Sequence, residues 1–114
     1  DSFHNAKHVS KIIYLYFNDL KENGHIFIDD ISWLLYAKDS VRDNFNSEIN
    51  NYETFYEILN VLNANMDNIS VCFDFTLSGL CKIKKNSNSE LKISKKIKYR
   101  NLSIKNFFRK LLMK

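Results

Sequence analysis

The chain has 114 residues, of which 45% are apolar and 14% aromatic, enough to build the core of one domain. It contains no run of about 18 uncharged apolar residues, which excludes a membrane-spanning helix. Two cysteines are too few for a disulfide framework and predict reduced, buried thiols in a nuclear or cytoplasmic protein. We expect residues 1–114 to form a single domain of a longer protein.

Charge is distributed very unevenly along the chain. Residues 1–81 carry five basic and twelve acidic side chains, a net charge of −7, whereas residues 82–114 carry twelve basic side chains and one acidic side chain, a net charge of +11. This polarity is the strongest compositional signal, because a basic segment of this kind attracts polyanions or acidic proteins.

The first third of the chain predicts two helices joined by a short extended piece. Residues 5–23 carry apolar side chains at steps of three and four, the pattern of an amphipathic helix that Gly24 would end. Residues 26–28 are apolar and extended, and Asp29 can cap a second helix. The inner face of that helix would hold Ile31, Leu34 and Leu35.

A third helix is predicted over residues 51–66, after a polar turn at residues 38–50. Its apolar side chains cover more than half of its circumference. A helix of this kind is either central to a core or buried partly against another chain.

From residue 69 the apolar period changes to two, which predicts strands. A three-residue loop, 77–79, would join two strands in a hairpin. The predicted register pairs Phe75 with Cys81, Phe73 with Ile83 and Asp74 with Lys82. Residues 91–99 would form a further strand with one basic face.

Ser103 would cap a last helix, which is basic and amphipathic. We expect this helix to pack on the sheet. The alternatives are binding to a membrane surface or capture by an acidic groove.

The stretch YFNDLKENGHIFIDDISWLL, within residues 12–36, resembles the opening of winged-helix domains. The resemblance implies an α+β, winged-helix-like fold: three helices followed by a β-hairpin or meander and a C-terminal helix. It also implies that the third helix reads DNA, but residues 51–66 contain no Lys or Arg and carry Glu53 and Glu57. Because two carboxylates would be repelled by phosphates, we expect protein–protein contact there instead.

The predicted function is therefore a non-enzymatic interaction domain. It would bind a protein partner, or a second copy of itself as a homodimer, within a nuclear, chromatin or replication assembly. The predicted interface consists of aromatic side chains: Trp33, Tyr36, Tyr52, Phe55 and Tyr56.

The basic end is either a solvated face that balances the acidic helices or a wing that contacts nucleic acid through its phosphates, without reading bases. The candidate nucleic-acid-binding residues are Lys82, Lys84, Lys85, Lys92, Lys95, Lys96, Lys98 and Arg100.

An alternative is a calmodulin-like adaptor with metal-free EF-hands that clasps a target helix. A calcium loop starting at Asp19 would place Gly24 and Ile26 correctly, but it would put Lys21 in the cation's site. This alternative predicts no strands beyond residue 69.

No catalytic or metal-binding pattern stands out. His4 and His8 are spaced like a metal pair but have no third ligand nearby, and the two glycines do not form a phosphate loop. We expect no enzyme activity, no cofactor, no bound metal and no small-molecule substrate.

Overall fold

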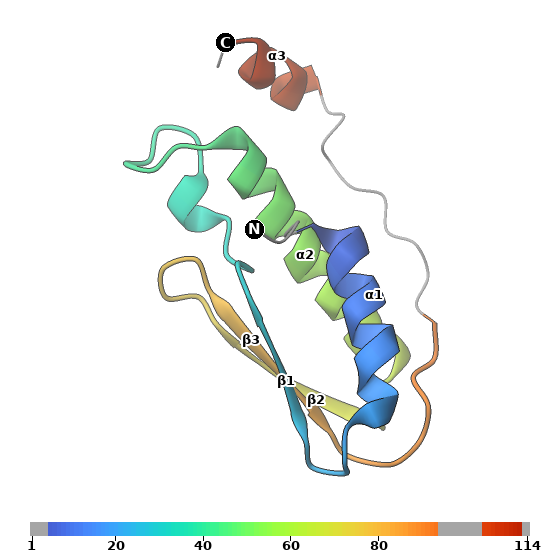
Figure 1. Cartoon of the computed structure of the whole chain (residues 1–114). Coiled ribbons are helices and arrows are strands. Elements are labelled where there is room, and N and C mark those ends of the chain that lie inside the picture. Colours follow the sequence, from blue (N-terminus) through green and yellow to red (C-terminus); the bar gives the residue numbers. More distant parts are fainter. Residues whose placement is uncertain (1–4, 94–103, 113–114) are drawn as a thin grey trace.

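The computed structural model describes residues 5–93 and 104–112 and has an α+β architecture. Helices α1 (Ala6–Tyr16) and α2 (Phe45–Ala64) lie against the same face of an antiparallel sheet (Figure 1). Single 3-10 turns, η1 (Phe17–Asp19) and η2 (Leu34–Tyr36), follow α1 and precede α2. None of the described helices is long and apolar enough to span a membrane.

The sheet has three described strands: β1 (His25–Asp29), β2 (Ile69–Asp74) and β3 (Leu80–Lys85). Their order is β1-β3-β2, so the central strand is the last one in sequence. The hairpin β2–β3 accepts β1 on its far side, and both pairings are antiparallel.

The predicted winged-helix-like fold is wrong, because the helix expected after Asp29, between the first helix and α2, does not form. The segment expected to be helical from Asp29 is the end of β1, an extended stretch and the single turn η2. Asp30 has a positive φ of 56°, and its N–H donates to the carbonyl of Gly79. Ser32 N–H likewise donates to the Ser78 carbonyl at 2.8 Å. Pairing with the distant hairpin therefore overrides the local capping signal.

The helix predicted over residues 51–66 exists but begins six residues earlier, at Phe45. Asn44 caps it, because its side-chain oxygen accepts a hydrogen bond from the N–H of Ser47 at 3.1 Å. The first helix is shorter than predicted and ends at Tyr16. Asn23, not Gly24, takes the left-handed conformation in the turn before β1.

The hairpin is present, but its predicted register is wrong by two residues. Phe73 pairs with Cys81, and Asp74 pairs with Leu80. The shift arises because the Asp74 carboxylate accepts the N–H of Thr76 at 2.8 Å, which starts the turn directly after Asp74. A shift of two keeps each side chain on its predicted face.

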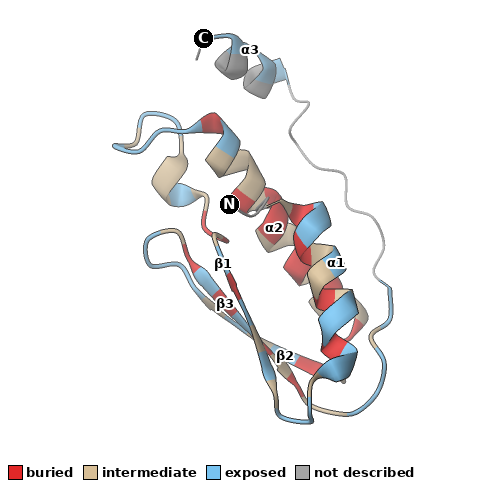
Figure 2. Ribbon diagram, viewed as in Figure 1, coloured by how far each residue is buried: buried red, intermediate tan, exposed pale blue. Residues whose placement is uncertain are grey.

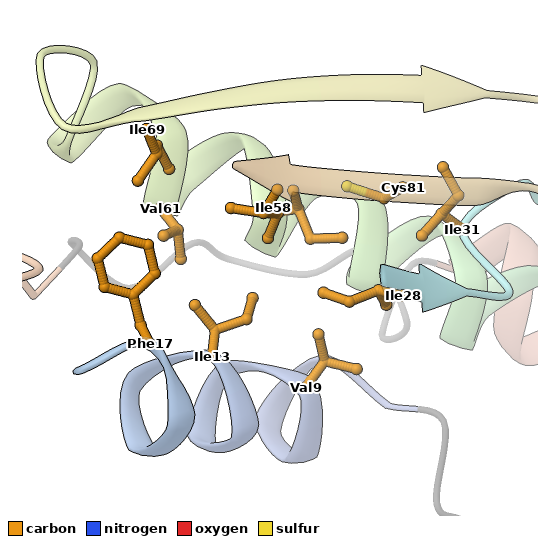
Figure 3. Close-up of a cluster of buried hydrophobic side chains, with 10 residues drawn as sticks. Val9, Ile13, Phe17, Ile28, Ile31, Ile58, Val61, Ile69 and Cys81 are labelled. Carbon is orange, nitrogen blue, oxygen red and sulfur yellow. The ribbon is translucent and has the colours of Figure 1, made fainter. Parts of the chain in front are cut away.

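The core lies between the helices and the sheet. Figure 3 shows Val9, Ile13 and Phe17 pointing from α1 and η1 toward the sheet. The buried residues that meet them come from α2, from the three strands and from the segment after β1: Ile28, Ile31, Ile58, Val61, Ile69, Cys81 and Ile83. The helices leave the other face of the sheet uncovered (Figure 2).

Helix α3 (Ile104–Leu112) does not bear out the expected packing onto the sheet. Its described apolar side chains are all exposed: Ile104, Phe107, Phe108, Leu111 and Leu112. The strand expected over residues 91–99 is absent from 91–93, and its remainder lies outside the described residues.

A buried lysine ties the end of the sheet to the end of the first helical segment. The Lys85 ammonium donates to the carbonyls of Phe17, at 3.1 Å, and Leu20, at 2.9 Å. It also lies 4.9 Å from the centroid of the Phe17 ring. A cation is favourable here because carbonyls at the end of a helical segment carry partial negative charge.

Replacing Lys85 by Met should lower the free energy of unfolding by about 2–4 kcal/mol, because two buried carbonyls lose a charged donor. Urea unfolding followed by circular dichroism would measure the loss. Lys82→Met, on the same strand but exposed, should change stability by no more than about 0.5 kcal/mol. Equal stability of the two variants would show that the buried ammonium is dispensable.

Candidate functional site

Six aromatic rings from three separate parts of the chain form a cluster where α2 meets the end of the sheet. We call this group the aromatic cluster. Its members come from the segment after β1, from one side of α2, and from β2 and the turn that follows it: Trp33, Tyr52, Phe55, Tyr56, Phe73 and Phe75.

Trp33 and Phe55 are at the centre of the aromatic cluster. The Trp33 ring lies 5.0 Å from Tyr52 and 5.3 Å from Phe55, measured between centroids. Phe55 in turn lies 4.9 Å from Phe73 and 5.4 Å from Phe75. Tilted and edge-to-face pairs at these separations are attractive beyond the area they bury.

The aromatic cluster is not a sealed core. All its members keep part of their surface in contact with solvent, and the Phe75 side chain is 41% exposed. Aromatic side chains that are held by neighbours yet still accessible are typical of protein interfaces.

Trp33 is positioned through the residue before it. The Ser32 carbonyl accepts a hydrogen bond from the buried Asn51 side chain at 2.8 Å, which anchors this segment to α2. On the other side, Ser32 N–H is bound to Ser78 in the hairpin turn. Ile31, one position earlier, is fully buried. The backbone beside Trp33 is therefore fixed from both layers of the fold.

Four of the five predicted interface residues belong to the aromatic cluster: Trp33, Tyr52, Phe55 and Tyr56. The fifth, Tyr36, lies in η2 and is half-buried. Sequence reasoning missed Phe73 and Phe75. The alternation of apolar residues predicted that both rings share one face of the hairpin. It gave no sign that the helices leave these two rings partly exposed near the hairpin turn.

The uncovered sheet face carries a second candidate surface, which we call the open sheet face. In the register of the sheet, Lys82 lies between Phe27 and Cys72. Lys84 lies between His25 and Ser70. Five of the six side chains are exposed and Lys84 is half-buried: His25, Phe27, Ser70, Cys72, Lys82 and Lys84.

The structure divides the predicted basic residues into separate groups. Lys82 and Lys84 share the open sheet face, and Lys92 is exposed beyond β3. Lys85 is only 4% exposed and donates to two backbone carbonyls, so it does not lie on a surface that nucleic acid could contact, contrary to the prediction. The other candidates lie outside the described residues: Lys95, Lys96, Lys98 and Arg100.

From the sequence we expected Glu53 and Glu57 of helix α2 to be exposed and to repel phosphates. The structure buries both carboxylates instead. Glu53 and Glu57 are 8% and 7% exposed. Burial raises the pKa of Glu53, whose Oε1 has no hydrogen-bond partner.

The next candidates are a metal site built from His, Cys, Asp or Glu side chains and the thiols of Cys72 and Cys81. Across residues 5–93 and 104–112, no three His, Cys, Asp or Glu side chains come together as metal ligands, and His4 lies outside these residues. Cys72 is exposed, contrary to expectation, whereas Cys81 is buried and burial raises the pKa of its thiol to about 12. The strands beyond residue 69 contradict the structure expected for a calmodulin-like adaptor.

No family model matches this chain, and no curated protein or solved structure matches it either.

Proposed function

We propose that this domain is a non-enzymatic interaction module that binds a protein partner through the aromatic cluster. The observation that carries the proposal is the convergence of six partly exposed rings from three chain segments on one surface. Trp and Tyr are the residue types that most often contribute large shares of binding energy at interfaces, and they do so from partly enclosed positions like these.

The support for a binding role over a purely structural one comes from Phe75. This ring lies in the turn after β2, where its exposed fraction of 41% leaves much of its apolar surface in water. Trp33 lies 6.4 Å from it and is itself only half-buried. A partner side chain placed on these rings would remove that apolar surface from water, which is favourable in proportion to its area.

A random linear peptide library, displayed on phage and panned against the purified protein, tests the proposal. We expect the selected peptides to be rich in apolar residues and to change the fluorescence of Trp33, the only tryptophan. Phe75→Ser should weaken their binding roughly tenfold or more, since a central interface ring contributes on the order of 2 kcal/mol.

Phe27→Ser is the matched control, because it removes an exposed phenyl ring from a different face of the molecule. It should leave peptide affinity unchanged. Failure to select any peptide, or equal binding by the two variants, would show that the aromatic cluster is not the binding surface. Thermal unfolding of both variants would establish that they remain folded.

A second candidate function is sequence-tolerant binding of single-stranded nucleic acid on the open sheet face. It is favoured by the position of Lys82 and Lys84 on the central strand, beside the exposed Phe27 ring. Lysines can neutralise phosphates while an aromatic ring stacks on a base, and sheet surfaces offer both in one plane.

Fluorescence anisotropy with labelled single-stranded DNA and RNA at two salt concentrations tests this second function. Lys82→Gln with Lys84→Gln should weaken binding at low salt and reduce the slope of log K against log salt by about 1.4, because two phosphate contacts are lost. Lys7→Gln with Lys11→Gln removes the same charge from exposed sites on α1 and should have a smaller effect. Absence of binding at low salt, or equal losses in both double variants, would end this candidate.

A further inference from the structure

The strand next to the aromatic cluster, β2, is an edge of the described sheet, because only β3 pairs with it. Residues in an antiparallel pair alternate in the direction of their backbone groups. The Asn68 carbonyl accepts the N–H of Asn86 on the β3 side, at 2.8 Å. The N–H and C=O groups of Val71 and Phe73 therefore point away from β3, to the free edge.

Nothing in β2 blocks another strand. Its sequence, ISVCFD, contains no Pro, no Lys or Arg and a single charge, that of Asp74. Its pairing with β3 is continuous from Ile69 to Asp74, without a bulge. Natural edge strands that remain unpaired usually carry at least one of these protections.

The strand is also complementary to itself. If two copies align antiparallel about a twofold axis at Cys72, Val71 lies opposite Phe73 and Ile69 lies opposite Phe75 on the inner face. The backbone directions of Val71 and Phe73 then agree, because these two residues are the ones whose N–H and C=O groups point to the free edge, while the Ile69 N–H already donates to the Asn65 carbonyl. On the outer face Cys72 meets Cys72, and Asp74 meets Ser70.

The charges fit this register. Ser70 is flanked by Lys84 in the same sheet, so Asp74 of one copy would lie two strand spacings, about 10 Å, from Lys84 of the other. The lysine and aspartate side chains, leaning toward each other, would bring the two charges closer than their backbones. No two like charges are directly opposed.

From these observations we infer that two copies of the chain associate by pairing their β2 strands antiparallel at Cys72, which joins the two sheets into one. This inference rests on the proposed function and deepens it, since Phe73 and Phe75 belong both to the aromatic cluster and to the paired segment. The partner of the interaction surface is then a second copy of this chain. Such an interface is isologous, as a twofold axis requires.

Sedimentation velocity over a concentration series measures the association. The wild-type chain should show a monomer–dimer equilibrium. Cys72→Glu should weaken it roughly fivefold or more, because two carboxylates would then be directly opposed at the axis. Within one copy this glutamate would face Lys82, its register partner, so the fold itself should not suffer.

Phe27→Glu is the matched control, because Phe27 is the register partner of Lys82 on the opposite edge of the sheet. It introduces the same charge beside the same lysine and should leave the dimer intact. Cys72→Ser, which adds no charge, should also leave it intact. Circular dichroism would verify that each variant folds.

Disulfide trapping gives a second readout. At a non-hydrogen-bonded antiparallel pair the two Cα atoms lie about 4.5 Å apart, within the range that a disulfide spans. Oxidised glutathione should therefore convert the wild-type chain, but not Cys72→Ser, into a covalent dimer linked through Cys72. Cys81, buried and with a raised pKa, should not take part.

A wild-type chain that stays monomeric, or a dimer that Cys72→Glu leaves unchanged, would overturn this inference. Neither result bears on peptides selected against the aromatic cluster, which are lost with Phe75→Ser if the proposed function holds. Loss of dimer with Phe27→Glu but not with Cys72→Glu would place the association on β1 and likewise overturn the inference.

Discussion

The arrangement of the molecule depends on the pairing of β1 with β3. This contact joins residues 25–29 to strand β3, more than fifty residues later in the chain, and makes β3 the central strand. The chain then crosses the hairpin turn at Gly79, where Asp30 N–H reaches the Gly79 carbonyl. Gly79 has a φ of +85°, and a Cβ there would lie 2.8 Å from Cγ1 of Ile31. Only glycine allows this crossing without strain.

Both candidate surfaces follow from this one pairing. The crossing delivers Trp33 from the β1 side of the sheet to the rings of α2 and β2, so the aromatic cluster would lose its central ring without it. The same pairing places Lys82 and Lys84 in the middle of the open sheet face and leaves β2 as an edge. Lys85 secures the far end of β3 to the first helical segment, which holds α1 over the core.

Local signals in the sequence were sufficient for some of this architecture and insufficient for the rest. The amphipathic stripe of α1, the apolar third helix and the alternation of β2 and β3 follow from periodicity, and four cluster rings could be named in advance. The segment after Asp29 could not be predicted, because Asp29, which resembles a helix cap, ends β1, and the next residue, Asp30, has a left-handed conformation and donates its N–H to Gly79 in the distant hairpin turn. The burial of Lys85 was hidden for the same reason: its carbonyl partners are 65 and 68 residues away in sequence.

The most direct test of this account is an NMR measurement of the surroundings of Trp33, the only tryptophan in the chain. If the β1–β3 pairing carries this side chain to the aromatic cluster, a NOESY spectrum should show cross-peaks from the indole ring to the rings of Tyr52 and Phe55, whose centroids lie 5.0 and 5.3 Å away. An indole that shows neither cross-peak and has the fluorescence of a fully solvated tryptophan would contradict the account.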